Sequence, residues 1–150
     1  TQQMHSCWLS LFEECRESLL YHVSETVFFG RKNHLTEKTF KPIAMGMPFV
    51  ITGTQGSLAY LREYGFKTFG DIWDESYDLE QDDFARLNKI ANLLKELDSK
   101  SQEEKQEIFN KCVPIIEHNW NHFYRGAFAD VLWHELMSMM EDIRDHLSDR

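Results

Sequence analysis

Residues 48–53 read PFVITG, a short apolar run between a proline and a glycine, and they give the clearest strand signal in the sequence. Upstream, residues 18–26 (SLLYHVSET) combine β-branched and aromatic residues with a polar end, which predicts a buried strand. Between them, residues 36–47 (TEKTFKPIAMGM) predict a short helix that Thr36 caps and Pro42 restricts. Strand, helix and strand in this order form the unit from which α/β layers are built.

Outside these segments, the spacing of apolar residues predicts helices over 6–17, 58–64, 81–98, 101–124 and 126–147. Ser101 and Glu104 have the spacing of a capping box, which marks the start of the longest of them. We therefore predict an α/β fold in which residues 1–75 form a small half-Rossmann-like parallel sheet and residues 76–150 form an α-helical C-terminal tail.

Length and composition predict a single domain over residues 1–150 and exclude several classes of protein. The net charge of −9 disfavours binding to nucleic acid, and no apolar run is long enough to span a membrane. The three cysteines (Cys7, Cys15 and Cys112) lack a CxxC spacing, which favours reduced thiols in a cytoplasmic protein. The opening TQQMHSCWLS has no basic segment or cleavage site and suggests a fragment of a longer chain.

The densest group of polar residues lies where the first predicted strand ends and the first long loop leads into Thr36. Glu25 ends that strand, and the cations that follow it are Arg31, Lys32, Lys38 and Lys41. Ligands of open α/β sheets bind outside the carboxyl ends of the strands, and a helix N-terminus favours phosphate. This segment therefore predicts an anion site, with a solvated loop and helix cap as the alternative.

This region resembles the C-terminal, donor-binding half of GT-B glycosyltransferases, in particular fucosyltransferase-like and exostosin-like enzymes. The matching residues are Thr36-Glu37-Lys38 and the strand residues Pro48-Phe49-Val50-Ile51, within a resemblance that covers about 45 of the 150 residues. It implies that the chain binds a nucleotide-sugar and transfers, or formerly transferred, the sugar.

The resemblance also implies a role for each site residue. Glu37 would hydrogen-bond the nucleotide ribose, and Lys38, with Arg31 and Lys41, would neutralise the diphosphate near Thr36. Glu25 would line the same mouth and orient donor or acceptor hydroxyls, so that Glu25 and Glu37 are the candidate catalytic residues.

The sequence also departs from that family. A complete GT-B enzyme has two Rossmann-like halves, and this chain has room for one, so that an N-terminal half carrying the catalytic base is expected to be missing. There is no DxD motif to bridge a metal to the diphosphate, and a divalent metal or other cofactor is therefore not indicated. Alone, the chain would bind a donor without transferring its sugar.

Two further groups of polar residues are weaker candidates. Residues 71–78 (DIWDESYD) place Asp74 and Glu75 among aromatics, and such carboxylates can bind a cation, although an acidic surface loop anchored by its aromatics is favoured. His118 and His122 have the spacing of metal ligands on a helix, but no third ligand is evident, and a hydrogen-bonded helix face is favoured.

An alternative function of a different class is a non-catalytic module for protein–protein interaction or oligomerisation. Residues 120–124 and 128–140 are rich in the aromatic residues and methionines that are enriched at interfaces. In that case these helices would form the dimer interface of a homo-oligomer or the face for another protein partner.

Overall fold

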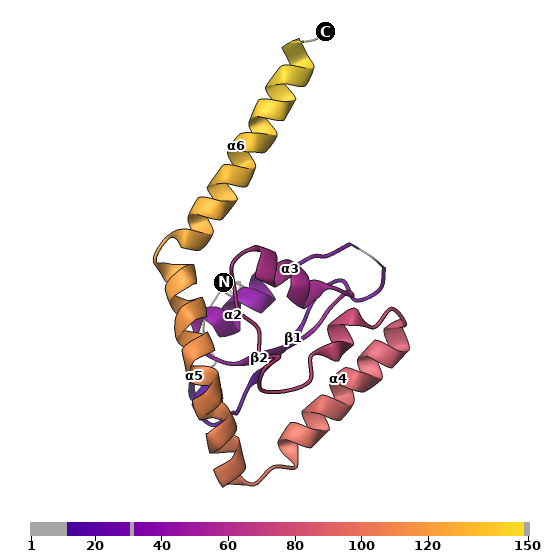
Figure 1. Cartoon of the computed structure of the whole chain (residues 1–150), viewed down its shortest axis with the longest axis vertical. Coiled ribbons are helices and arrows are strands. Elements are labelled where there is room, and N and C mark those ends of the chain that lie inside the picture. Colours follow the sequence, from indigo (N-terminus) through magenta and orange to yellow (C-terminus); the bar gives the residue numbers. More distant parts are fainter. Residues whose placement is uncertain (1–11, 31, 149–150) are drawn as a thin grey trace, which may run out of the picture.

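The computed structural model of the chain describes residues 12–30 and 32–148. Its elements are, in chain order, α1 (Phe12–Arg16), β1 (Tyr21–Ser24), α2 (Glu37–Ala44), β2 (Phe49–Thr52), α3 (Ser57–Glu63), the 3-10 helix η2 (Ser76–Leu79), α4 (Asp83–Asp98), α5 (Gln102–Tyr124) and α6 (Ala127–Ser148). Figure 1 shows the two strands between α4 and α5, and α6 extending away from the rest of the fold.

The strands β1 and β2 form a parallel two-stranded sheet, in which Tyr21 pairs with Phe49 and Ser24 pairs with Thr52. Parallel strands need a crossover connection, and α2 provides it. Thr36 caps the α2 helix as predicted, because its hydroxyl accepts a hydrogen bond from the Lys38 backbone N–H. The predicted fold class, a small parallel sheet followed by helices, is confirmed.

The core lies between the sheet and the helices that cover it. Phe49 of β2 meets Phe69 edge to face with ring centroids 5.1 Å apart, and Phe69 stacks on Trp73 at 4.9 Å. The loop before η2 therefore contributes aromatic side chains to the centre of the fold, as expected of an acidic loop anchored by its aromatics. Ile43 of α2 and Ile90 of α4 are also buried in this core.

Several boundaries differ from the prediction. The first strand covers only the middle of residues 18–26, and of the predicted helix 6–17 the structure describes residues from Phe12 onward. Phe84 and Leu87 have the apolar spacing of the predicted helix 81–98 but do not belong to the buried face of α4, because both are exposed. The α5 helix, in contrast, has both reciprocal hydrogen bonds of its predicted capping box between Ser101 and Glu104.

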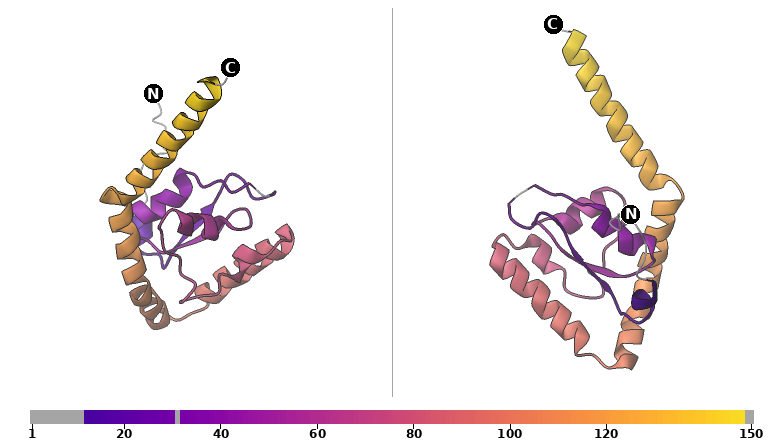
Figure 2. Two further views of the ribbon diagram at one scale, coloured as in Figure 1. Left: turned by 45° about the horizontal axis from the view of Figure 1, so that its top comes forward. Right: turned by 180° about the vertical axis from the view of Figure 1, so that it is seen from behind.

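The α6 helix is attached to the rest of the fold through its first turns. Phe128 packs against Phe40, Phe66 and Phe123, with ring centroids 5.0 to 6.1 Å from its own, and the Tyr64 hydroxyl donates to Glu135 at 3.2 Å. Beyond these contacts α6 projects outward, as both views of Figure 2 show. Among the described residues, no helix combines the length and apolar composition that a bilayer crossing needs.

Candidate functional site

The carboxylate of Glu25 connects the end of β1 to the start of α2. Its Oε1 accepts hydrogen bonds from the Thr36 backbone N–H at 3.0 Å and from the Thr39 hydroxyl at 2.6 Å. Its Oε2 accepts from the Thr36 hydroxyl at 2.6 Å and from the Thr26 backbone N–H at 3.3 Å. Glu25 is only 6% exposed, so these four hydrogen bonds replace its contacts with water.

This environment keeps the Glu25 carboxylate ionised. Burial raises the pKa of the carboxyl, but the hydrogen bonds from Thr36, Thr39 and Thr26 together outweigh it, and the pKa lies below its ordinary value. Glu25 was predicted to orient hydroxyls of a donor or acceptor. Its oxygens are instead occupied by groups of its own chain, and we therefore assign it a positioning role.

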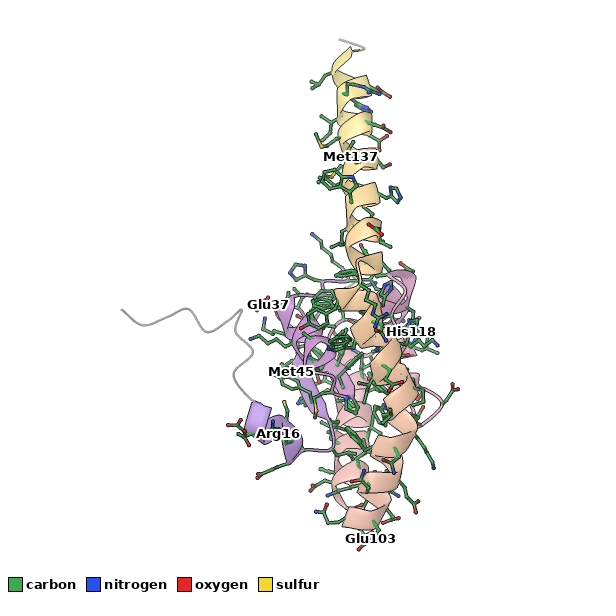
Figure 3. The ribbon with its side chains drawn as sticks, turned by 90° about the vertical axis from the view of Figure 1, so that its left-hand side faces the viewer. Arg16, Glu37, Met45, Glu103, His118 and Met137 are labelled. Atoms are coloured by element: carbon green, nitrogen blue, oxygen red, sulfur yellow. The ribbon has the colours of Figure 1, made fainter. Side chains whose placement is uncertain are left out.

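Glu37 and Lys38 lie side by side at the first turn of α2 and face solvent. The Lys38 ammonium donates a hydrogen bond to the Thr26 hydroxyl at 2.8 Å and lies 3.8 Å from a Glu37 carboxylate oxygen. The Lys38 side chain is 39% exposed and the Glu37 side chain is 44% exposed. Figure 3 shows Glu37 at the surface of the fold, close to the start of α2. An ammonium and a carboxylate are thus presented together at the carboxyl end of β1.

The other residues predicted for this site are Thr36, Lys41 and Arg31. Thr36 is used by the fold, because its hydroxyl donates to Glu25 and accepts from the Lys38 N–H. Lys41 lies one turn further along α2, three residues after Lys38 and therefore on a neighbouring part of the same face. Arg31 lies outside the described residues. The structure therefore brings Glu37, Lys38 and Lys41 together on one helix.

The loop after β1 also reaches the end of β2. The Thr54 hydroxyl, which follows β2, lies 3.4 Å from the Lys32 carbonyl oxygen and 3.2 Å from Asn33 Oδ1. The backbone around the exposed Lys32 is thereby held beside the end of the second strand. The two carboxyl ends of the strands and the polar loop thus form one continuous region.

Sequence reasoning missed Arg86, which fixes the segments around this region. Its guanidinium donates to the backbone carbonyls of Phe28 at 2.9 Å and Gly53 at 3.2 Å, which follow β1 and β2. It also donates to the Glu80 carbonyl at 3.0 Å and pairs with the Asp83 carboxylate at 2.6 Å. The side chain is only 1% exposed, and all of these partners lie near the carboxyl ends of the strands.

A signal for Arg86 was present in the spacing of α4. The buried side of that helix carries Arg86, Ile90, Leu93 and Leu97, which are four, three and four residues apart. Arginine is almost never fully buried unless it is paired. A single arginine in a stripe of this spacing indicates a buried side chain with several partners.

Two carboxylates of the acidic loop, Asp74 and Glu75, have different hydrogen-bond partners. Glu75 accepts hydrogen bonds from the Thr68 hydroxyl at 2.7 Å and the Phe69 N–H at 2.8 Å, and burial raises its pKa. Asp74 instead accepts from the backbone and hydroxyl of Ser76, each at 2.8 Å, on the exposed side of the loop. These two weaker candidates therefore accept hydrogen bonds from neighbouring turns of the chain, and they share no partner among those bonds.

Asp78 acts at the start of α3. Its carboxylate accepts hydrogen bonds from the N–H groups of Leu58 at 2.9 Å and Ala59 at 3.0 Å, which are unpaired donors of the first helical turn. Within residues 12–30 and 32–148, no group of three or more histidine, cysteine or acidic side chains is arranged to hold a metal ion.

The two histidines of α5 are hydrogen-bonded to the end of the α3 segment. His118 Nε2 lies 3.0 Å from the Gly65 carbonyl oxygen, and His122 Nε2 lies 2.7 Å from that of Tyr64. Their rings are nearly parallel, with centroids 6.0 Å apart. The interpretation of this pair as a hydrogen-bonded helix face is therefore confirmed.

A groove of about 810 Å³ lies elsewhere, between α1, the end of α2, α4 and α5. It is lined by Leu19 and Leu20, which precede β1, by Met47, which precedes β2, and by Leu94 and Phe109 of the two long helices. Figure 3 shows Arg16 and Met45, which also line it, below Glu37. The groove thus faces the amino ends of the strands, away from Glu37 and Lys38.

Comparisons of the chain with models of known protein families, with curated proteins and with solved structures find no match.

Proposed function

We propose that the chain is a nucleotide-sugar-binding domain similar to the donor-binding half of GT-B glycosyltransferases. The observation that carries the proposal is the exposed pair of Lys38 and Glu37, whose ammonium and carboxylate lie 3.8 Å apart. The pair stands where α2 begins and β1 ends, which is the end of a parallel sheet at which ligands of α/β proteins bind.

The two groups have complementary chemistry for a nucleoside diphosphate. The Lys38 ammonium would pair with a phosphate oxygen, and the Glu37 carboxylate would accept hydrogen bonds from the ribose hydroxyls. Ribose and phosphate are adjacent parts of a nucleotide, so neighbouring residues can contact both. Lys41, on the next turn of α2, would supply a second cation for the diphosphate.

The buried residues explain how this pair is held in place. Glu25 fixes the first turn of α2 against the end of β1, and the Thr26 hydroxyl holds the Lys38 ammonium at 2.8 Å. In a transfer reaction, stabilising the departing diphosphate is the contribution that Lys38 and Lys41 would make. The base that activates an acceptor would come from a second α/β half.

Titration calorimetry with UDP, GDP and their sugar conjugates tests this proposal. We expect saturable binding that Lys38→Ala weakens by at least about tenfold, which corresponds to about 1.4 kcal/mol. Lys111→Ala is the matched control, because Lys111 is an exposed lysine on α5, far along the chain from the site. Glu37→Gln should weaken the nucleotides but not inorganic pyrophosphate, because its proposed partner is the ribose.

Two results would contradict the proposal. One is the absence of saturable binding of any of these ligands to the wild-type chain. The other is an equal loss of affinity in Lys38→Ala and Lys111→Ala, which would show that only overall charge matters.

A further inference from the structure

One face of α6 is apolar over most of its length. Five residues on it are spaced alternately three and four apart and form what we call the seam: Trp133, Leu136, Met140, Ile143 and Leu147. Further apolar side chains flank the seam, namely Leu132, Met137 and Met139. An alternating spacing of three and four is the repeat by which helices pack side by side in coiled coils.

The rest of the described chain leaves this face uncovered. The eight side chains are between 39% and 66% exposed, and α6 extends beyond the body of the protein in every view (Figures 1 and 2). The aromatic contacts that attach α6 involve Phe128, which lies before the seam begins. The seam is therefore separate from the surface that anchors the helix.

The charged residues of the same segment lie outside the seam. Glu135, Glu141, Asp142 and Asp145 occupy positions between the seam residues, on the sides of α6 that turn away from it. A second helix could therefore cover the seam without burying any of these carboxylates, a burial that would cost several kcal/mol per unpaired charge.

We propose that the seam of α6 binds the seam of a second copy of this chain, so that the protein is a homodimer. From their exposed fractions, the eight side chains present about 800 Å² per copy, which equals the contribution of one partner to an interface of standard size. Patches of this area exceed the roughly 300–600 Å² that is usual for the largest apolar patch of a monomer.

The chemistry of α6 favours a second copy over a lipid surface. Helices that lie on membranes carry lysine and arginine on their polar face, which attract anionic lipids. Outside the seam, this part of α6 carries the four acidic residues and one arginine, Arg144, so its net negative charge would be repelled by such lipids. Because both copies present the same seam, one two-fold interface satisfies both apolar faces at once.

Sedimentation equilibrium of the chain between about 1 and 100 µM tests the proposal, since interfaces of this size commonly associate within that range or more tightly. We expect the wild-type mass to be twice the 17.8 kDa of one chain. Met140→Glu should sediment as a monomer, because its charge enters the seam. Ser138→Glu adds the same charge on the opposite side of α6 and should remain dimeric. Circular dichroism of both variants monitors folding.

Three outcomes would overturn the inference. A wild-type mass of 17.8 kDa at every concentration would exclude the dimer. Equal association of Met140→Glu and Ser138→Glu would place the interface elsewhere. Binding of monomeric wild-type chain to phosphatidylglycerol vesicles would assign the seam to lipid. Nucleotide binding should be the same in Met140→Glu and wild type, and this separates the dimer from the proposed donor site.

Discussion

Replacing Glu25 with glutamine removes one charge and one acceptor from the hydrogen bonds that join the end of β1 to the start of α2. Glutamine has the same size, but only one of its two terminal atoms accepts hydrogen bonds. The hydroxyls of Thr36 and Thr39 can rotate to suit an amide, whereas the backbone N–H groups of Thr26 and Thr36 cannot. Either orientation of the amide therefore leaves one backbone N–H facing another donor.

The magnitude follows from these contacts. A partly buried N–H left without an acceptor costs up to about 1–3 kcal/mol, and the remaining hydrogen bonds lose the added strength of a charged acceptor. We expect Glu25→Gln to lower the free energy of unfolding by about 3 kcal/mol. For a chain of 150 residues, this corresponds to a fall in Tm of roughly 6–12 °C.

Urea denaturation followed by circular dichroism measures this difference, with Glu63→Gln as the control because Glu63 is an exposed residue on α3. A free energy within about 0.5 kcal/mol of the wild-type value, as for an ordinary surface substitution, would refute the role assigned to Glu25.

The free energy of unfolding of wild type and Glu25→Gln, measured as a function of pH, provides a second test. The Glu25 carboxyl has a pKa below its ordinary value of 4.5 in the folded chain, so the unfolded chain binds its proton more readily. Its stabilising effect is complete above pH 4.5 and is lost as the pH falls further towards the lowered pKa. The difference in the free energy of unfolding between wild type and Glu25→Gln should therefore be constant near neutral pH and become smaller below pH 4.5. A difference that widens on acidification would contradict this reasoning.

Three further predictions concern other positions of the fold. Arg86→Met should lower the free energy of unfolding in urea by about 4 kcal/mol, whereas Lys95→Met, at an exposed position of the same helix, should have little effect. Gly65→Ala should cost about 2 kcal/mol in the same assay, because the Gly65 φ of +88° disfavours a side chain and an added Cβ would lie 2.8 Å from the His122 ring; a neutral effect would show that this turn adjusts freely. Burial raises the pKa of Cys112 to about 12, so this thiol should resist iodoacetamide at pH 8 until the chain unfolds, as measured by peptide mass spectrometry.

The fold was predictable where the signals are local. The PFVITG run, the Thr36 cap and the Ser101–Glu104 capping box each involve residues within a few positions of one another, and the structure has all three. The order strand, helix, strand then favours a parallel sheet. The helical crossover carries the chain back to the end of the sheet where it started, so the second strand runs in the same direction as the first.

The candidate site was predictable only in part, because its supporting contacts join distant positions. The residues Thr36-Glu37-Lys38 made Glu37 and Lys38 candidates, but the sequence does not show that Glu25 reaches eleven residues forward to Thr36. Arg86 contacts the carbonyl of Gly53, which is thirty-three residues away. Such pairs depend on tertiary packing, which sequence periodicity does not encode.

The helices α2 and α3 begin beside carboxylates from other segments of the chain, Glu25 at α2 and Asp78 at α3. These internal anions already compensate the partial positive charge of the backbone N–H groups, so an incoming phosphate gains little from either helix dipole. Its attraction then depends on lysine side chains in water, whose fields decay over about 8 Å at physiological ionic strength. Affinity for any phosphorylated ligand should consequently fall steeply with added salt, and ionic strength becomes a practical control on occupancy.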